Sequence, residues 1–271
     1  MVVNMHPQPV GFASDLVDAA LRAALAVPAR VPVFALSGLQ GTGKSTLAAQ
    51  MAARAQAQGQ RAVVLSLDDL YLRHADRQHL AREVHPLLAT RGPPGTHDVA
   101  LGCRVLDALR TGQAITLPRF DKLADDRLPL SQADAIDAAV DLVIVEGWCL
   151  GASAEDDAAL EAPLNALERE EDPQAIWRRY CNTALARDYP ALWQRFDCLW
   201  FLQPPGFDVV VDWRWQQEQA LAQAQGREAS MDRDGVARFV QHFERVSRQA
   251  LRTLPGIAEQ VIRLDAQRRP F

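Results

Sequence analysis

VPVFALSGLQGTGKSTLAAQMAARAQAQ, residues 31–58, combines an apolar run, a glycine-rich turn and an alanine-rich segment without interruption. The run Val31–Ser37 predicts a buried strand, in which Pro32 is tolerated because it stands at the beginning. The segment Lys44–Gln58 predicts a helix, and Gly59 follows it where helices often have glycine. A strand, a tight turn and a helix in this order are typical of α/β proteins.

The turn itself matches the pattern Gly-x4-Gly-Lys-Ser of a phosphate-binding loop, also called Walker A. Its glycines let backbone N–H groups point inward around phosphates, and the following helix directs its positive end to the same place. Lys44 would reach the β- and γ-phosphates, and Ser45 would offer its hydroxyl to Mg²⁺. We therefore expect a nucleoside triphosphate to bind on Gly38, Gln40, Gly41, Thr42, Gly43, Lys44, Ser45 and Thr46. The loop alone does not separate kinases from GTPases or ATPase motors.

The rest of the chain alternates strand-like and helix-like segments. Further strands are expected at 61–67, 141–145, 198–202 and 261–264, and helices at 14–27, 101–110, 176–186, 211–225 and 231–254. This alternation predicts an α/β protein with a P-loop NTPase fold, in which a mostly parallel five-stranded sheet has helices on both faces. We expect residues 1–271 to form a single domain.

Composition limits the partners of the chain. The formal net charge is −5, without the basic excess of a general nucleic-acid binder. No apolar stretch approaches the roughly 18–20 residues of a membrane span. The four cysteines have no metal-ligand spacing and the N-terminus lacks a signal-peptide pattern, so we expect reduced thiols and a cytoplasmic location. We expect a small-molecule partner and neither nucleic acid nor membrane.

Three carboxylates follow predicted strands, at the edge of a parallel sheet where ligands bind. Asp68 and Asp69 come directly after the second strand, where they could hold Mg²⁺ or accept a proton from an attacking hydroxyl. Glu146 ends the third strand, as in the Walker B arrangement that orders Mg²⁺. The alternatives are a helix-capping role for the aspartates and a turn acid at Glu146.

Two further features of the charge pattern are unusual. Of the 29 basic residues only Lys44 and Lys122 are lysines, which indicates sites where a guanidinium does not serve, although compositional drift is the alternative. Residues 155–172 carry eight acids and one arginine. We expect this segment to be a solvated surface excursion, with an acidic partner surface as the alternative.

Together, several motifs resemble the D-glycerate 3-kinase family of plant type, with its bacterial and fungal kinase-like members, over roughly residues 33–245. They are GLQGTGKST, SLDDLYL, HPLLATRGPPGTHD, LPRFDK, VIVEGWCLG, PLNALE and DWRWQQE. The resemblance implies an ATP- and Mg²⁺-dependent kinase that phosphorylates D-glycerate to 3-phosphoglycerate. The family is related to uridine kinase, phosphoribulokinase and pantothenate kinase.

The resemblance also implies roles for individual residues. Asp68 would be the catalytic base, assisted by Lys44, and Mg²⁺ would be held by Ser45, Asp68 and Glu146. An acceptor-side insertion would span about 71–130 and a helical lid about 205–232. The acceptor would be bound by Asp69, Tyr71, Arg91, His97, Asp98, Arg119, Asp121 and Lys122, and the lid would carry Arg214 and Arg227.

The chemistry of glycerate agrees with this set, because a small anion with two hydroxyls needs a cation and several hydrogen-bonding groups. Arg91, Arg119 and Lys122 can supply the cation, and His97, Asp98 and Asp121 the hydroxyl partners. Alternatives are that Arg91 binds backbone carbonyls, His97 is a packed loop residue and Asp98 caps the next helix.

The sequence departs from the family at two places. Leu70 stands where phenylalanine is expected, and residues 123–127 (LADDR) replace a glycine-containing loop that would lie near the acceptor. Other acceptors, such as a nucleoside, pantothenate or another polyol acid, therefore stay open, as does a regulatory ATPase. A GTPase is disfavoured, because the chain lacks the Asn-Lys-x-Asp motif.

Overall fold

Five strands form one parallel sheet in the computed structural model, which describes residues 11–224 and 231–271. The strand order is β2-β7-β1-β8-β9, and every pairing is parallel. The strands are β1 (Val33–Gly38), β2 (Ala62–Ser66), β7 (Leu142–Gly147), β8 (Cys198–Gln203) and β9 (Gln260–Arg263). The predicted α/β fold with a parallel five-stranded sheet is confirmed.

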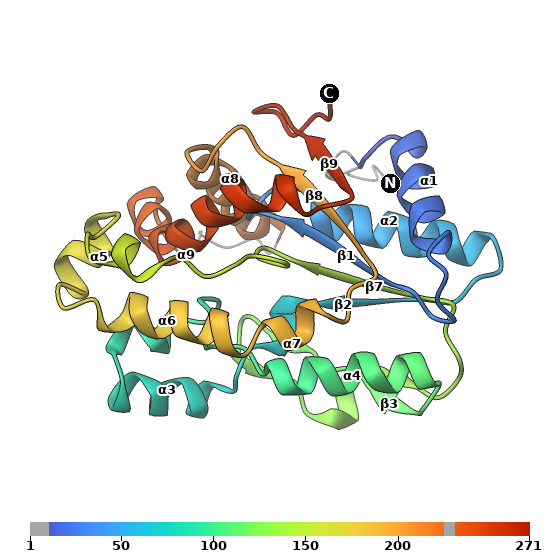
Figure 1. Cartoon of the computed structure of the whole chain (residues 1–271), viewed down its shortest axis with the longest axis horizontal. Coiled ribbons are helices and arrows are strands. Elements are labelled where there is room, and N and C mark those ends of the chain that lie inside the picture. Colours follow the sequence, from blue (N-terminus) through green and yellow to red (C-terminus); the bar gives the residue numbers. More distant parts are fainter. Residues whose placement is uncertain (1–10, 225–230) are drawn as a thin grey trace, which may run out of the picture.

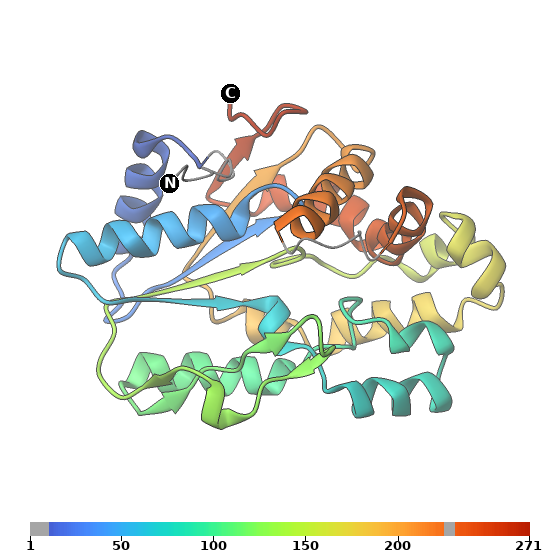
Figure 2. The same cartoon turned by 180° about the vertical axis from the view of Figure 1, so that it is seen from behind.

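Alternate residues of each strand face two separate apolar cores. On β1, Phe34 and Leu36 pack against α1 (Ser14–Leu25) and α2 (Lys44–Ala57), and Figure 2 shows α2 in blue along this face of the sheet. Val33 and Ala35 belong to the opposite core, which includes residues of α4 (Val99–Thr111), α7 (Pro190–Trp193) and α9 (Arg233–Thr253). Successive side chains of a strand point to opposite faces of the sheet, so both faces are apolar and both are covered by helices, as Figure 1 shows.

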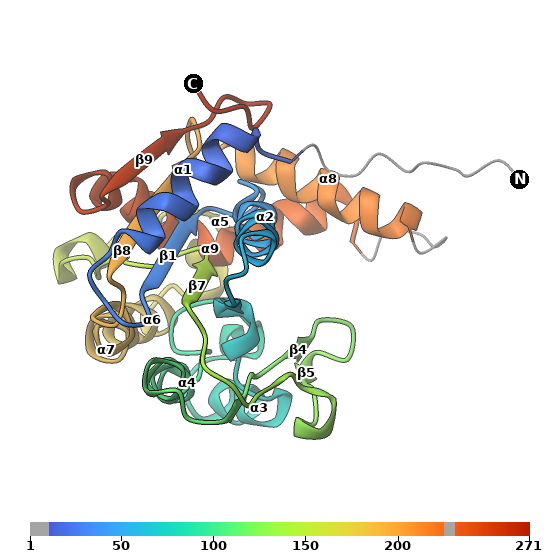
Figure 3. The same ribbon diagram turned by 90° about the vertical axis from the view of Figure 1, so that its right-hand side faces the viewer.

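The remaining elements lie around this framework. They are the helices α3 (His74–Glu83), α5 (Ala166–Glu171), α6 (Ile176–Arg187) and α8 (Val209–Ala224), and the short strands β3 (Ile115–Thr116), β4 (Phe120–Asp121), β5 (Asp126–Arg127) and β6 (Ala135–Ile136). β3 pairs with β6 and β4 with β5, both antiparallel. Figure 3 shows the β4–β5 hairpin (residues 120–127) extending from the body of the molecule. Two-residue strands carry no periodic pattern, so the sequence did not predict them.

The structure also bears on the cysteines and on possible membrane-spanning helices. The cysteines Cys103, Cys149, Cys181 and Cys198 are all free, as expected of reduced thiols. Within residues 11–224 and 231–271, no helix is both long enough and apolar enough to cross a membrane.

Candidate active site

The glycine-rich loop connects β1 to α2, and the eight predicted phosphate-binding residues run from the last residue of β1 to the first turn of α2. Gly41 and Gly43 have φ angles of +85° and +88°, a left-handed conformation that glycine adopts without the steric penalty of a side chain. Thr42 closes the turn, since its backbone N–H and its hydroxyl both donate to the Leu39 carbonyl, at 3.2 and 2.9 Å. Gly43 precedes α2 and has no side chain to cap it, which leaves the positive end of this 14-residue helix for an anion.

Glu146 lies between the loop and the end of β2. It pairs in register with Leu36 of β1 on one side and with Ser66 of β2 on the other. Its side chain is buried, and its Oε2 atom lies 3.9 Å from Nζ of Lys44. Within the described part of the chain, this oxygen has no hydrogen-bond partner. A buried carboxylate oxygen next to the loop lysine is therefore open to a further ligand.

Asp68 follows β2 in a short 3₁₀ turn, whose start is capped by the Ser66 hydroxyl, which accepts from the Asp68 N–H at 3.2 Å. The Tyr71 hydroxyl donates to Asp68 Oδ1 and the Lys122 ammonium donates to Oδ2, both at 2.6 Å. Burial raises the pKa of Asp68, but the charges of Lys122 and Lys44 and these hydrogen bonds together lower it to about 2. Asp68 is thus ionised at neutral pH.

The neighbouring Asp69 holds the start of the β4–β5 hairpin. It accepts from Arg119 Nη1 at 2.8 Å and from the Phe120 backbone N–H at 3.1 Å. Burial raises the pKa of Asp69, and the charge of Arg119 opposes this effect. Arg119 also pairs with Asp134 at 2.8 Å. Adjacent aspartates therefore hold different cations: Asp69 holds the arginine that precedes the hairpin, and Asp68 holds a lysine within it.

A second set of ion pairs anchors the other strand of the hairpin. Asp125 pairs with Arg91 and with the buried Arg77, at 2.9 Å for the latter. Arg127 donates to the Tyr71 carbonyl at 2.8 Å and pairs with Asp98 at 3.1 Å. Arg77, Asp125 and Arg127 were not predicted from the sequence, because no motif marks a residue whose partners lie about 30–55 positions away.

The structure places the other predicted acceptor residues in distinct settings. The Asp98 side chain caps α4 by accepting from the Leu101 N–H at 2.9 Å, and Asp121 accepts from the N–H of Leu123 at 2.8 Å inside the hairpin turn. His97 is buried, with Nδ1 2.6 Å from the Tyr189 hydroxyl, and burial lowers its pKa to about 4. The capping alternative for Asp98 and the packed-loop alternative for His97 thus describe contacts that are present.

Tyr71 connects these residues to the base candidate. Its ring lies 5.0 Å from the His97 ring and 5.1 Å from the Phe120 ring, measured between centroids. Burial, reinforced by the Asp68 charge, raises the pKa of Tyr71 well above its usual value, so the hydroxyl keeps its proton. The structure therefore brings the loop lysine, Glu146, Asp68, Tyr71 and Lys122 together at the carboxyl edge of the sheet.

The predicted lid begins with α8. Arg214 pairs with Glu218 one turn later at 3.1 Å and lies over the Phe239 ring of α9 at 5.9 Å. Arg227 lies outside the described residues. The adjacent Trp213 is buried and packs on the loop, because a Cβ atom at Gly41 would lie only 2.6 Å from Trp213 Cβ. A buried tryptophan carries no local signal for such a contact, so the sequence did not single it out.

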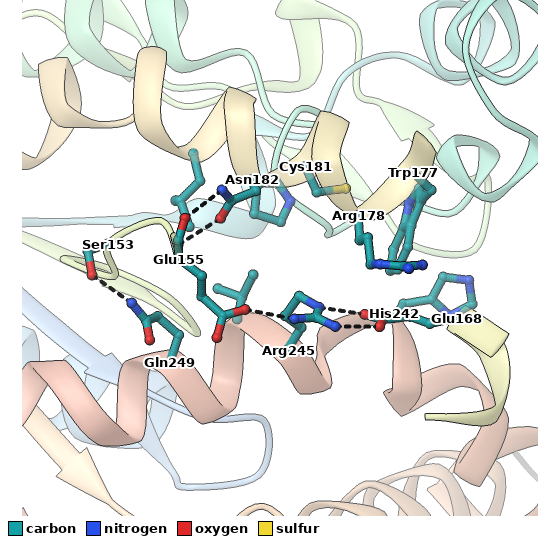
Figure 4. A pocket seen from close by; sticks show the side chains of 13 residues that line it. Ser153, Glu155, Glu168, Trp177, Arg178, Cys181, Asn182, His242, Arg245 and Gln249 are labelled. Atoms are coloured by element: carbon teal, nitrogen blue, oxygen red, sulfur yellow. Dashed lines mark hydrogen bonds and ion pairs between the residues drawn. The ribbon is translucent and has the colours of Figure 1, made fainter. Parts of the chain in front are cut away.

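The acidic segment 155–172 is the expected solvated surface segment only in part. Five of its eight acids are exposed, namely Asp156, Asp157, Glu161, Glu170 and Glu171. Its Glu168 and Asp172 are fully buried, and Asp172 pairs with the buried Arg178 at 3.1 Å. Figure 4 shows Arg245 of α9 bound to both Glu155 and Glu168, at 3.0 and 2.7 Å. This cluster surrounds a cavity of about 20 Å³, the size of a single water molecule, and contains no residue of the phosphate-binding loop. The two buried acids and Glu155 therefore pair with arginines, which the composition did not predict.

Comparisons with known proteins point to one group of enzymes. No model of a known protein family matches the chain. The uncharacterized kinase mug58 of Schizosaccharomyces pombe is 34% identical over 221 residues, which cover 78% of each chain. The structure is similar to D-glycerate 3-kinase from Cryptococcus neoformans, with a TM-score of 0.77 and 25% identity over 94% of this chain and 95% of the other. It is also similar to the YGR205w protein, with a TM-score of 0.69 and 24% identity over 95% and 94% of the two chains.

Proposed function

Because the chain belongs to the D-glycerate 3-kinase family of P-loop kinases, we propose that it transfers the γ-phosphoryl group of ATP to a hydroxyl of D-glycerate, giving 3-phosphoglycerate and ADP. The relatives make it a kinase, which is a phosphotransferase with a nucleotide-binding P-loop. The identity of the acceptor as D-glycerate is the part of the proposal that goes beyond these relatives.

The position of Asp68 carries the proposal. This carboxylate pairs with Lys122 of the β4–β5 hairpin and also interacts with the positive charge of Lys44 in the phosphate-binding loop. A hydroxyl placed beside it would face the end of the phosphate chain, as in-line transfer requires. Asp68 would accept the proton of the attacking hydroxyl late in the transfer, which suits a weak base. Lys44 would stabilise the charge on the transferring group.

The ion pairs of the three candidate acceptor-binding cations favour an anionic acceptor. Arg91 pairs with Asp125, and Arg119 pairs with both Asp69 and Asp134; the two arginine side chains are 27% and 29% exposed. Lys122 has a side chain that is 59% exposed and pairs with Asp68. It is therefore the cation that an incoming carboxylate can redirect at the lowest cost. When Lys122 turns to the acceptor, Asp68 loses a positive neighbour and becomes a stronger base.

Oxygen donors suited to Mg²⁺ surround the end of the loop. Ser45, Asp68 and Glu146 supply a hydroxyl and two carboxylates, which are ligands that Mg²⁺ prefers. The open Oε2 atom of buried Glu146 fits such an ion. We propose that these residues hold Mg²⁺, which when bound neutralises charge on the β- and γ-phosphates. The side chains of the chain itself then orient the acceptor and move its proton.

The proposal also assigns two larger regions. Residues 71–130, which include the β4–β5 hairpin, would form the acceptor side of the site within one kinase domain. Residues 205–232, which include α8, would form a lid whose arginines close over the phosphates and exclude water. Arg214 is the lid cation that lies within the described residues.

The test is ADP release from Mg-ATP by the purified protein, with D-glycerate, L-glycerate, pantothenate, uridine or no acceptor. We expect strong stimulation by D-glycerate, and a loss of about 10²–10⁴-fold in kcat for Asp68→Asn. Asp76→Asn, the same change at an exposed position on α3, is the matched control and should behave as wild type. Stimulation by another acceptor would replace the substrate and keep the mechanism. Hydrolysis that no acceptor stimulates would indicate a regulatory ATPase.

A further inference from the structure

The segment that follows β9 folds back into a hook, residues 264–271. Leu264 and Pro270 form an antiparallel bridge. The Asp265 side chain accepts from the backbone N–H of Gln267 and of Arg269, both at 2.8 Å. These contacts turn the chain so that Arg268 adopts a φ of +64°, which is unfavourable for a residue with a side chain. Such a conformation persists where the surroundings hold it in place.

Arg268 uses its guanidinium to join the hook to the phosphate-binding loop. Its Nε donates to the Gly41 carbonyl at 2.7 Å, and its Nη2 donates to Gln216 Oε1 at 2.8 Å. The guanidinium carbon lies 4.9 Å from the centre of the Trp213 ring. The indole N–H of Trp213 in turn donates to the Ala266 carbonyl of the hook at 3.0 Å. One side chain thus touches the loop and two residues of α8.

These contacts hold one peptide plane of the loop at both ends. The carbonyl of the Gly41–Thr42 peptide accepts from Arg268, and its N–H donates to the Leu39 carbonyl at 3.2 Å. Because a peptide unit is planar, fixing both groups fixes the orientation of the whole unit. Gly41 has no side chain and a positive φ, so this plane has little intrinsic preference for one orientation. The bond from Arg268 is charge-assisted and partly shielded from solvent, and is therefore of the stronger kind.

We propose that Arg268 is a positioning residue, which preorganises the loop for the phosphate chain through Gly41 and links the loop to α8 through Trp213. It acts on the phosphates through the backbone of the loop. Arg268 should therefore raise the affinity for any ligand with a phosphate chain, whether or not that ligand carries a nucleobase. The inference rests on phosphate binding by the loop, and is independent of which acceptor is used.

The experiment compares binding of Mg-ATP and Mg-tripolyphosphate by calorimetry, without acceptor, to wild type, Arg268→Met and Arg268→Lys. Arg269→Met is the matched control, since Arg269 is adjacent, exposed and paired with Asp265. We expect Arg268→Met to weaken both ligands by about tenfold, which corresponds to about 1.4 kcal/mol. Arg268→Lys, which keeps a donor but loses the planar stacking, should recover part of the affinity. Arg269→Met should stay within about twofold of wild type.

Three results would overturn the inference. The first is that Arg268→Met binds both ligands with the affinity of the wild type, and the second is that Arg269→Met loses as much affinity as Arg268→Met. A loss confined to ATP, with tripolyphosphate unaffected, would make Arg268 a contact of the base. If Arg268→Met does not fold, as judged by its melting curve, the affinities of Arg268→Lys for the two ligands are compared with those of wild type and Arg269→Met in the same way. Affinity that depends on Arg268 in a protein that no acceptor stimulates would refute the proposed acceptor and leave this role intact.

Discussion

Replacing Lys122 by methionine tests how the site recognises its acceptor. The change removes the ammonium, which lies 2.6 Å from Asp68, and keeps an apolar chain of similar length. The proposal predicts that this ammonium moves to the carboxylate of D-glycerate. Loss of Lys122 should therefore weaken the use of the acceptor and leave the binding of ATP little changed.

The exposure of Lys122 sets the size of the effect. A hydrogen bond to a charged group is worth about 1.5–3 kcal/mol. Since the Lys122 side chain is 59% exposed, solvent screens the interaction and the lower part of this range applies, about 1.5–2 kcal/mol. At about 1.4 kcal/mol per factor of ten, kcat/KM for D-glycerate should fall by about 10–30-fold.

The assay is initial-rate kinetics with D-glycerate varied at saturating Mg-ATP, and then with ATP varied. Arg104→Met is the control, because it removes a cation from the exposed surface of α4. Lys122→Arg tests whether the charge alone suffices, and we expect it to restore only part of the loss because a guanidinium is larger and planar. The reasoning is refuted if kcat/KM for D-glycerate stays within twofold of wild type. It is equally refuted if KM for ATP rises as much as KM for D-glycerate.

Two further predictions concern stability. Arg245→Met leaves the buried Glu168 without its cation, whereas Glu155 keeps Arg252, so the free energy of unfolding should fall by about 3–5 kcal/mol in urea titrations, and a loss below 1 kcal/mol would contradict the buried pair. Burial lowers the pKa of His97 from 6.5 to about 4, so the folded protein resists its protonation. Its contribution, about 3 kcal/mol, is fully present above pH 6.5 and is lost as the pH falls toward 4. Urea titrations between pH 7 and 4.5 should show this loss, and His97→Gln should reduce the slope with pH; equal slopes in the variant and wild type would contradict the assignment.

Much of the fold was predictable because its signals are local. The strand, glycine turn and helix of residues 31–58 lie within one short segment, and the apolar runs that became the central strands β1 and β7 are buried on both faces of the sheet. The same locality placed Asp68 and Glu146, since a carboxylate that directly follows a strand of a parallel sheet must lie at its carboxyl edge. Local chemistry therefore suffices for the nucleotide side of the site.

The proposed acceptor side depends on contacts between distant segments. Asp68 and Lys122 are 54 positions apart, and only the folding of the β4–β5 hairpin over the end of β2 makes them partners. The contact of Arg268 with Gly41 spans 227 positions. The composition of 155–172 does not reveal that two of its acids, Asp172 and Glu168, are buried and pair with arginines of α6 and α9. Periodicity and motifs describe neighbours along the chain, whereas the pairing of buried charges follows from packing, which brings together residues that carry no common pattern.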